Sequence, residues 1–425
     1  MLTFLTLLLG VAWGPQKIEL GAPAGTAAVE IFLDGDRIAR RHRPPWTFVV
    51  DLGPAPAPHH LDAVAFDARG TEVGRVRQKL NVPRREAEAT LTLLPGKGGT
   101  GRVARLDWET LVHPAPLRVT VNFDGRPLAV SEPRHIELPP FVPEQVHFLR
   151  AVVQLERGFR AEAEITFGGR TRNETSRELT AVAVRVAGGA LPAPEAMSGW
   201  LAGGRAPLQV AAAEAGEGRV VFVLDAHGPE AFSRLYTSLF FRESLGKLKG
   251  DPEIRTVFPY ASAAAGSRAT YDVYPRSFPL YMRDGLLRAL AEQDPLSEWL
   301  ERCPRMADAA TTAGLAAAAW SHPRAVVVVL SGDSDASILP AVHARSFLAD
   351  LGVPLLVWVV APGSRDAAAG WGGGRTVRTR AEFRSAAREL EAVMADQRIV
   401  WVEGEHLPQS ISVTSAAPKG VTVAR

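Results

Sequence analysis

Long uninterrupted apolar runs in the second half of the chain predict buried strands. The run Arg219–Leu224 ends at a carboxylate, Asp225, and similar runs occupy residues 325–330 and 354–361. Strands that are covered on both faces are typical of a parallel sheet flanked by helices. Apolar residues at helical spacing separate the runs, over residues 229–247, 286–300, 309–320, 341–351 and 381–395. We therefore expect residues 219–425 to form a doubly wound, Rossmann-like α/β domain of about five or six strands.

Short alternating strands separated by Gly-containing turns fill the first half of the chain. Residues 29–33, 46–52 and 61–66 follow this pattern, which predicts antiparallel β-sandwiches. We assign one sandwich to residues 15–84, a second to 85–185, and junction strands to 186–218. The stretches "VEIFLDGDRIARRHRPPWTFVVDLG" and "HHLDAVAFDARGTEVGR" resemble the Ig-like modules of exported bacterial proteins. That resemblance implies a spacer or an adhesive surface and names no ligand.

Composition limits the classes of partner. The 425 residues are 46% hydrophobic, which is enough for several packed cores. The 48 basic and 46 acidic residues nearly cancel, so nothing in the charge balance indicates a nucleic-acid partner. The single cysteine, Cys303, excludes an internal disulfide framework and a cysteine-based zinc cluster.

The first fourteen residues form an uncharged, largely apolar segment. Its length fits the core of a signal peptide and is too short to span a bilayer. We therefore expect an exported protein, which is periplasmic, secreted or bound at the cell surface, with no transmembrane span in the mature chain. Two alternatives are a buried N-terminal strand and a start codon placed downstream of the true one.

Three stretches of the second half resemble a von Willebrand factor type A domain. They are "RVVFVLDAHGP", "AVVVVLSGDSDAS" and "ARSFLADLGVPLLVWVVAPG", in that order. In this family the first strand ends in Asp-x-Ser-x-Ser, and a later strand ends in a Thr/Ser-Asp-Gly turn. The resemblance implies an α/β domain that binds a protein partner.

The resemblance also implies a divalent-ion site, whose ligands are only partly present. Mg²⁺ requires about six oxygen ligands. Asp225 matches the family's first ligand, but His227 and Pro229 stand where the family has serines. The family's threonine aligns near Leu280, and Asp333 is displaced by one position. We predict no cofactor, and at most a degenerate Mg²⁺ site with Asp225 and Asp333 as its carboxylates.

Asp225 is better explained as an N-cap of the helix that follows it. Binding would then use the loops at this sheet edge. We expect the binding surface to include Asp225, His227, Ser331, Asp333, Ser334 and Asp335.

An enzymatic alternative rests on three residues. Gly332-Asp333-Ser334-Asp335-Ala336 approximates the Gly-x-Ser-x-Gly turn, and Asp366 and His406 follow later strands. Ser, Asp and His in this order are typical of α/β-hydrolases, so an esterase using these residues is the second interpretation. The two carboxylates beside Ser334 would disfavour an oxyanion there. The first interpretation is therefore a non-catalytic, exported protein that binds another protein of unknown identity.

Overall fold

The computed structural model describes the chain except for a set of short segments. These are residues 9, 84–86, 96–101, 111–115, 125, 143–145, 156–159, 169–178, 187–193, 205, 215–217, 236–252, 261–272, 277–284, 296–299, 301, 320–322, 333 and 362–364. The chain divides into two compact units. One comprises Met1–Pro83 and Glu178–Arg425, and the other comprises Arg84–Arg177. None of the described helices is long and apolar enough to cross a membrane.

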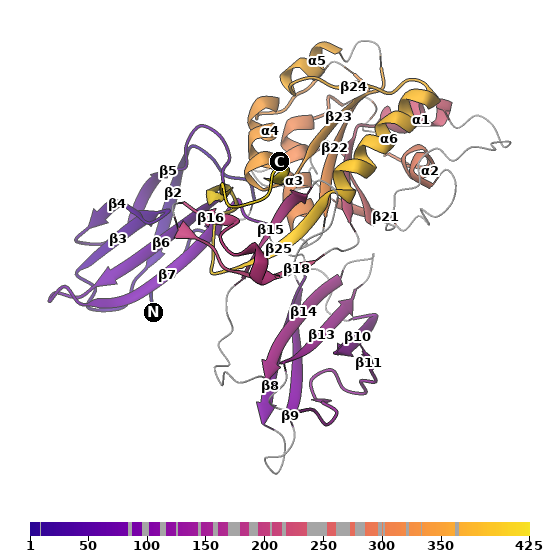
Figure 1. Cartoon of the computed structure of the whole chain (residues 1–425). Helices are drawn as coiled ribbons and strands as arrows, with labels where there is room; N and C mark the ends of the chain where they lie inside the picture. The colour runs from indigo at the N-terminus through magenta and orange to yellow at the C-terminus, as the bar shows by residue number, and fades with distance from the viewer. Residues whose placement is uncertain are drawn as a thin grey trace. The chain divides into compact units, whose positions relative to one another are not determined.

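The N-terminal part of the first unit is a β-sandwich of two antiparallel sheets (Figure 1). Because side chains alternate between the two faces of a strand, Ile18, Val29, Ile31 and Leu61 all point into a shared core. One sheet has the order β1 (Thr3–Phe4), β2 (Pro15–Gly21), β5 (Thr47–Asp51). The other has the order β4 (Asp36–Arg41), β3 (Ala28–Leu33), β6 (His59–Phe66), β7 (Glu72–Leu80).

The apolar first fourteen residues belong to this sandwich. Leu2, Phe4 and Leu8 are buried in its core. The side chain of Asn81 accepts a hydrogen bond from the Ala12 N–H at 2.7 Å and donates one to the Ala12 carbonyl at 2.6 Å. The segment thus contributes one short strand, β1, and several core side chains to this sandwich.

The second unit is also a β-sandwich, with a core that includes Leu106, Leu149 and Val153. One sheet has the order β11 (Arg126–Leu128), β10 (Arg118–Phe123), β13 (Val146–Gln154), β14 (Arg160–Gly168). The other has the order β12 (Ile136–Glu137), β9 (Arg102–Thr110), β8 (Ala87–Pro95). The sandwich character expected for both N-terminal modules is therefore confirmed.

A six-stranded sheet carries the apolar runs of the second half. Its order is β21 (Val273–Arg276), β20 (Glu253–Val257), β19 (Arg219–Leu224), β22 (Arg324–Leu330), β23 (Leu355–Val359), β24 (Arg375–Thr376). All neighbours are parallel except β21, which is antiparallel to β20. Every residue of β19 and β22 is buried, as their unbroken apolar character predicts.

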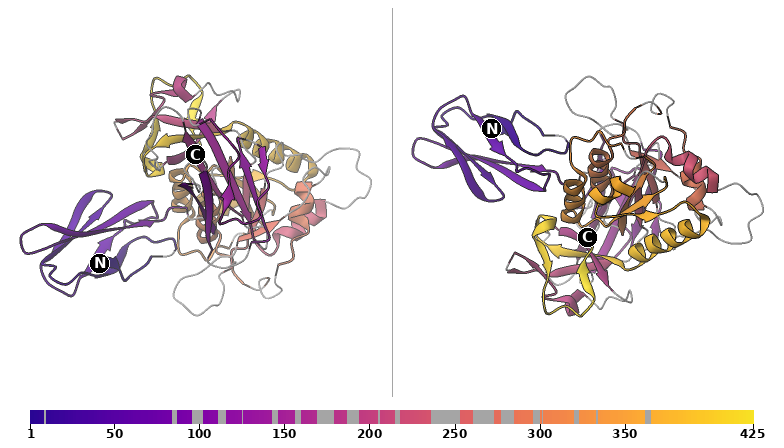
Figure 2. Two further views of the ribbon diagram at one scale, coloured as in Figure 1. Left: turned by 90° about the horizontal axis from the view of Figure 1, so that it is seen from below. Right: turned by 90° about the horizontal axis from the view of Figure 1, so that it is seen from above.

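Helices cover both faces of this sheet (Figure 2). One face packs against α1 (Gly228–Leu235), α2 (Gly285–Ala291) and α6 (Arg380–Ala395), around the aromatic rings of Phe222, Phe232, Trp358 and Phe383. The other face packs against α3 (Met306–Ala318), α4 (Ala341–Asp350) and α5 (Arg365–Gly370).

Strands from residues 179–214 and from residues 397–423 together build a third pair of antiparallel sheets. One sheet has the order β18 (Val210–Glu214), β25 (Gln397–Glu403), β15 (Leu179–Val186), β27 (Val421–Val423). The other has the order β17 (Ala206–Pro207), β16 (Leu201–Gly203), β26 (Ile411–Val413). A short 3₁₀ turn, η2 (Pro194–Met197), precedes β16, and a second, η5 (Pro408–Ser410), precedes β26.

The fold class expected from the sequence is wrong for the chain as a whole. Strand residues outnumber helical residues, and most sheets of the described residues are antiparallel. Parallel pairing joins the three apolar runs, but the α/β assignment does not hold to Arg425, because β25 and β27 pair antiparallel with β15. Most of β15 lies within residues 85–185, the range expected for the second sandwich, but it pairs with β25 and β27. Short apolar strands such as β25 do not reveal from periodicity alone which sheet they join.

Candidate functional site

The first candidate site lies where β19 ends, at the carboxylate Asp225. The residue is only 4% exposed. Its Oδ1 accepts hydrogen bonds from the N–H groups of His227 (3.1 Å) and Gly228 (2.9 Å), and Ser331 at the end of β22 donates its hydroxyl to both carboxylate oxygens. The parallel strands β19 and β22 are neighbours, so their carboxyl ends bring Asp225 and Ser331 together.

The turn after Asp225 depends on a glycine. A Cβ atom at position 228 would lie 2.2 Å from Cδ1 of Leu224. Gly228 therefore allows the chain to turn directly from the strand into α1, and Asp225 bonds amides at the start of that helix. Such amides otherwise lack an intrahelical partner, so the carboxylate replaces the water that would solvate them.

Burial dominates the electrostatics of Asp225. It raises the pKa of the carboxyl group above its ordinary value, against the opposing effects of the Ser331 hydroxyl, the two amides and the nearby His227 side chain. Tyr260, which is 5% exposed, closes the site by accepting a hydrogen bond from the Ala226 N–H at 3.1 Å. The carboxylate is thus enclosed by neutral hydrogen-bond donors.

The loop after β22 is fastened to the start of α3. Asp335 accepts hydrogen bonds from the N–H of Met306 (3.0 Å) and from both the N–H and the hydroxyl of Ser337. Ser337 in turn accepts from the N–H of Ala307 at 2.8 Å. Asp308 completes the exchange by accepting from the N–H groups of Ile338 (3.1 Å) and Leu339 (2.9 Å). The loop and the helix therefore cap one another.

The remaining predicted binding residues have different surroundings. Ser334 is exposed and lines a hollow of about 180 Å³ together with Asp225, Asp335 and Trp371. His227 is exposed at the rim of the Asp225 turn. Asp333, and Leu280 where the family's threonine aligns, lie outside the described residues. Among the residues that the structure describes, no three His, Cys, Asp or Glu side chains gather as metal ligands.

The residues of the hydrolase alternative do not share a site. Ser334 follows β22 of the six-stranded sheet, whereas His406 follows β25, a strand of another sheet. The His406 ring bonds the Glu403 carbonyl through Nε2 at 2.9 Å. Asp366 is exposed on α5. Within the described part of the chain, no hydrogen bond joins any two of these three residues.

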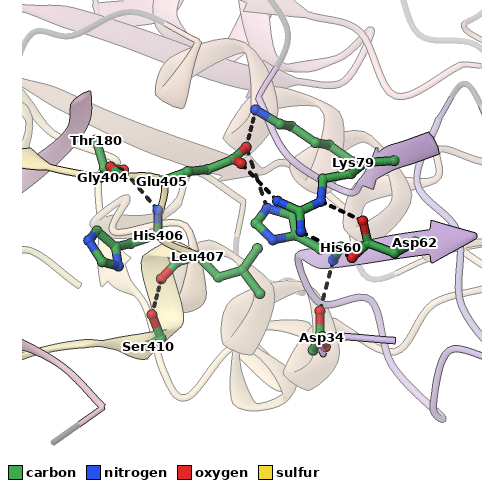
Figure 3. Close-up of polar contacts among 11 residues, drawn as sticks. Asp34, His60, Asp62, Lys79, Thr180, Gly404, Glu405, His406, Leu407 and Ser410 are labelled. Carbon is green, nitrogen blue, oxygen red and sulfur yellow. Dashed lines mark hydrogen bonds and ion pairs between the residues drawn. The ribbon is translucent and has the colours of Figure 1, made fainter. Parts of the chain in front are cut away.

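A second candidate site was not predicted, and it surrounds Glu405 (Figure 3). Arg77 Nη1 lies 3.0 Å from Glu405 Oε2, Lys79 forms an ion pair with Oε1, and His60 Nε2 lies 3.8 Å from Oε1. The other end of the Arg77 guanidinium forms a bidentate pair with Asp62, at 2.8 and 3.1 Å. Glu405 therefore connects β6 and β7 of the N-terminal sandwich to the loop after β25.

The backbone around Glu405 is held on both sides. Thr180 Oγ1 donates to the Gly404 carbonyl at 2.7 Å and accepts from the His406 N–H at 3.0 Å. The Gln409 side chain donates to the Pro58 carbonyl of the sandwich at 2.7 Å. Burial alone would raise the pKa of Glu405, but Lys79, His60 and Arg77 outweigh it and the pKa is lowered. At His60 burial has the largest effect and lowers the pKa.

Comparison with known proteins finds only distant structural similarity. No family model matches the sequence, and no curated protein matches it. The fibronectin(III)-like modules of Clostridium thermocellum CbhA align at 20% identity over 19% of this chain and 93% of theirs, with a TM-score of 0.17. The central fibronectin-III array of RIM-binding protein aligns at 11% identity over 43% of this chain and 65% of its own, with a TM-score of 0.20.

A third similar structure is SGBP-B of the Bacteroides ovatus mixed-linkage glucan utilization locus, in complex with a mixed-linkage heptasaccharide. It aligns at 12% identity over 49% of this chain and 57% of its own, with a TM-score of 0.14. None of the three structures named here is a von Willebrand factor type A domain.

Proposed function

We propose that this chain is a non-catalytic, exported protein that binds another protein through the segment 334–342. This segment contains the loop after β22 and the first residues of α4. This segment lies at the sheet edge that the sequence indicated as the binding surface. No metal ion takes part in the binding. The β-sandwich modules, which resemble those of exported bacterial proteins, support an extracellular setting.

The exposure of Ile338 is the observation that carries the proposal. Its side chain is 70% exposed, and Val342 in the same segment is 48% exposed. The backbone beneath Ile338 is nevertheless fixed, because its N–H is bonded by Asp308 and Asp335 anchors the preceding turn. An exposed apolar side chain on a backbone that is already fixed requires less ordering when a partner covers it.

The Asp225 site supports this role indirectly. Both carboxylate oxygens accept from Ser331, and Asp225 is almost completely buried, so Asp225 stabilises the loops from the interior of the protein. The contacts with the partner would come from the exposed residues of the loop after β22. This division of roles is typical of a binding surface that is presented by a rigid scaffold.

Site-specific photo-cross-linking tests the proposal. We would place a benzophenone amino acid at position 338 of the full chain and irradiate it in the cells that make the protein. We expect one discrete protein adduct. The matched control carries the same group at Val49, a valine of β5 that is 72% exposed on the sandwich. The same adduct from both positions, or none from position 338, would contradict the proposal.

A second variant measures the contribution of the side chain. Ile338→Asp should weaken the purified complex about tenfold or more, since burying a carboxylate against an apolar partner is costly. It should leave the folded chain intact, because the side chain is 70% exposed. Thermal unfolding of Ile338→Asp should therefore match that of the unmodified protein, and a Val49→Asp control should bind normally.

A further inference from the structure

A buried histidine of the second unit lies between two hydrogen-bond acceptors. His147 is a residue of β13 and is 6% exposed. Its Nδ1 is 2.7 Å from Oδ2 of Asp124, and its Nε2 is 2.9 Å from the carbonyl oxygen of Val142. Asp124 belongs to the turn between β10 and β11, whereas Val142 belongs to the segment that leads into β13. One imidazole ring therefore joins two separate segments of this sandwich.

These two contacts determine the charge of the ring. A carboxylate oxygen and a carbonyl oxygen only accept hydrogen bonds, so both ring nitrogens must carry a proton to bond them. A neutral imidazole has a single N–H, and its other nitrogen would hold a lone pair against an acceptor 2.7 or 2.9 Å away. The geometry around His147 therefore fits the charged imidazolium form.

Three phenylalanine rings surround the imidazole. Phe123 of β10 stacks on it, with ring centroids 5.5 Å apart and an interplanar angle of 14°, and Phe167 of β14 lies 5.8 Å away. A cation above an aromatic face is attracted to it, so the stacked ring favours the charged imidazole. Phe141, which precedes Val142, lies 5.0 Å from the imidazole and 5.3 Å from Phe167. The residue whose ring packs on His147 is thus next to the residue whose carbonyl bonds it.

Asp124 is the charged group that the described part of the second unit places against this ring, and the core residues of both sheets around it are apolar. The hydrogen bond to Asp124 has the largest effect on the pKa of His147 and raises it above the ordinary value of 6.5. The Val142 carbonyl acts in the same direction, and burial opposes both. The stabilisation by the charged ring is therefore fully present below pH 6.5 and is lost as pH rises through the folded pKa.

We propose that residues 138–142 form a pH-sensitive flap of the second sandwich, which is closed while His147 is charged and released when the ring loses its proton. The charged ring bonds the Val142 carbonyl and the Asp124 carboxylate together, whereas the neutral ring can donate to only one of them. Release of Phe141 uncovers parts of the Phe123 and Phe167 rings, which it contacts in the closed form. The flap is separate from the segment 334–342, so either proposal can fail alone.

Nuclear magnetic resonance of the full chain tests the proposal. One probe is the ring carbon of His147 in protein labelled with ¹³C-histidine, and the other is 4-fluorophenylalanine placed at position 141 and observed by ¹⁹F. We expect both signals to change with one shared midpoint, which lies above the ordinary histidine value of 6.5. A soluble nitroxide broadens fluorine signals that are accessible to water. It should broaden the signal at position 141 several-fold more above the midpoint than below it.

A second fluorine position is the control for the nitroxide measurement. Phe383 of α6 packs against Phe232 and Trp358 in the core of the six-stranded sheet. With 4-fluorophenylalanine at position 383, the broadening should be small and should not change with pH. A change at both positions would mean that the whole chain loosens, which would overturn the flap.

Variants of the second unit assign the effect to His147. Asp124→Asn keeps an acceptor oxygen and tolerates the positive φ of 48° at this position, but it removes the negative charge, so both midpoints should fall. The matched control Asp107→Asn removes a carboxylate of β9 that is 39% exposed and should leave both midpoints unchanged. His147→Gln should abolish the pH response at position 141, whereas His135→Gln, at a histidine that is 51% exposed, should retain it.

Thermal unfolding at pH 6 shows whether each variant is folded. If His147→Gln does not fold, Asp124→Asn decides the question alone. A His147 midpoint at or below 6.5, or nitroxide broadening at position 141 that does not change with pH, would overturn the flap. Equal midpoints in Asp124→Asn and the unmodified chain would overturn it as well.

Discussion

Asp225 and Glu405 are two carboxylates that follow the ends of two strands, and they are held in opposite ways. Asp225 is bonded by two backbone amides and one hydroxyl, all neutral. Glu405 is bonded by Arg77 and Lys79 and approached by His60. The first carboxylate closes a turn and meets a hydroxyl on the neighbouring strand, whereas the second joins charged side chains of the N-terminal sandwich to the loop after β25. The position of a carboxylate at a strand end therefore does not define its role, because the role depends on whether the neighbouring hydrogen-bond donors are neutral or charged.

The two sites should respond to acid with opposite sign. The pKa of Glu405 is lowered in the folded chain, so its contribution is present above the ordinary value of 4.5 and is lost as pH falls through the folded pKa. The pKa of Asp225 is raised above 3.8. Its ionised form therefore costs stability at neutral pH, and that cost disappears as pH falls through the folded pKa.

The largest effect is expected from Asp225→Ala. The substitution leaves two amides and the Ser331 hydroxyl without their acceptor in a buried site, which should cost about 2–3 kcal/mol locally. Hydrogen exchange of the β19 and β22 amides measures this loss. Asp366→Ala, which removes an exposed carboxylate on α5, is the control. A loss below about 0.5 kcal/mol would show that Asp225 does not hold the turn.

The same comparison shows how much of the molecule the sequence predicts. The runs Arg219–Leu224 and Arg324–Leu330 are nearly unbroken and apolar, so burial on both faces follows from local pattern. Parallel strands end at one edge of a sheet, so Asp225 and Ser331 were expected at the same edge. The Glu405 site does not follow in this way. Its partner Arg77 is 328 positions away, and their meeting depends on the antiparallel pairing of β25 with β15. No local periodicity encodes that pairing. Polar residues that follow a short strand carry the only signal, and it is common to most loops.

A smaller effect is expected from Glu405→Gln. The ion pairs are partly solvated, because the side chains of Arg77 and Lys79 are 44% and 50% exposed. Because solvent screens ion pairs that are this exposed, the loss of these pairs should cost only about 1 kcal/mol of folding stability at neutral pH. The loss should shrink in high salt and below pH 4.5.

Hydrogen exchange of β7 and of the loop after β25 measures this change. The control is Glu230→Gln, which removes an exposed pair with Arg234 on α1 and should change stability by only a few tenths of a kcal/mol. If the Glu405→Gln effect were independent of salt and pH, the charged contacts would not be its cause, and the contrast with Asp225 would fail.

The smallest effect is expected from Asp225→Asn. The amide oxygen still accepts from the N–H groups of His227 and Gly228, and the Ser331 hydroxyl can rotate to accept from the new NH₂ group. The variant also removes the cost of burying a charge. At pH 7 its stability should therefore equal or exceed that of the unmodified chain, within about 0.5 kcal/mol.

The difference should vanish as pH falls through the folded pKa of Asp225, and adding Mg²⁺ should change the stability of neither protein. A loss of more than about 1 kcal/mol at pH 7, or stabilisation of the unmodified chain alone by Mg²⁺, would mean that the negative charge itself is needed. Asp225 would then resemble Glu405 in depending on a positive partner.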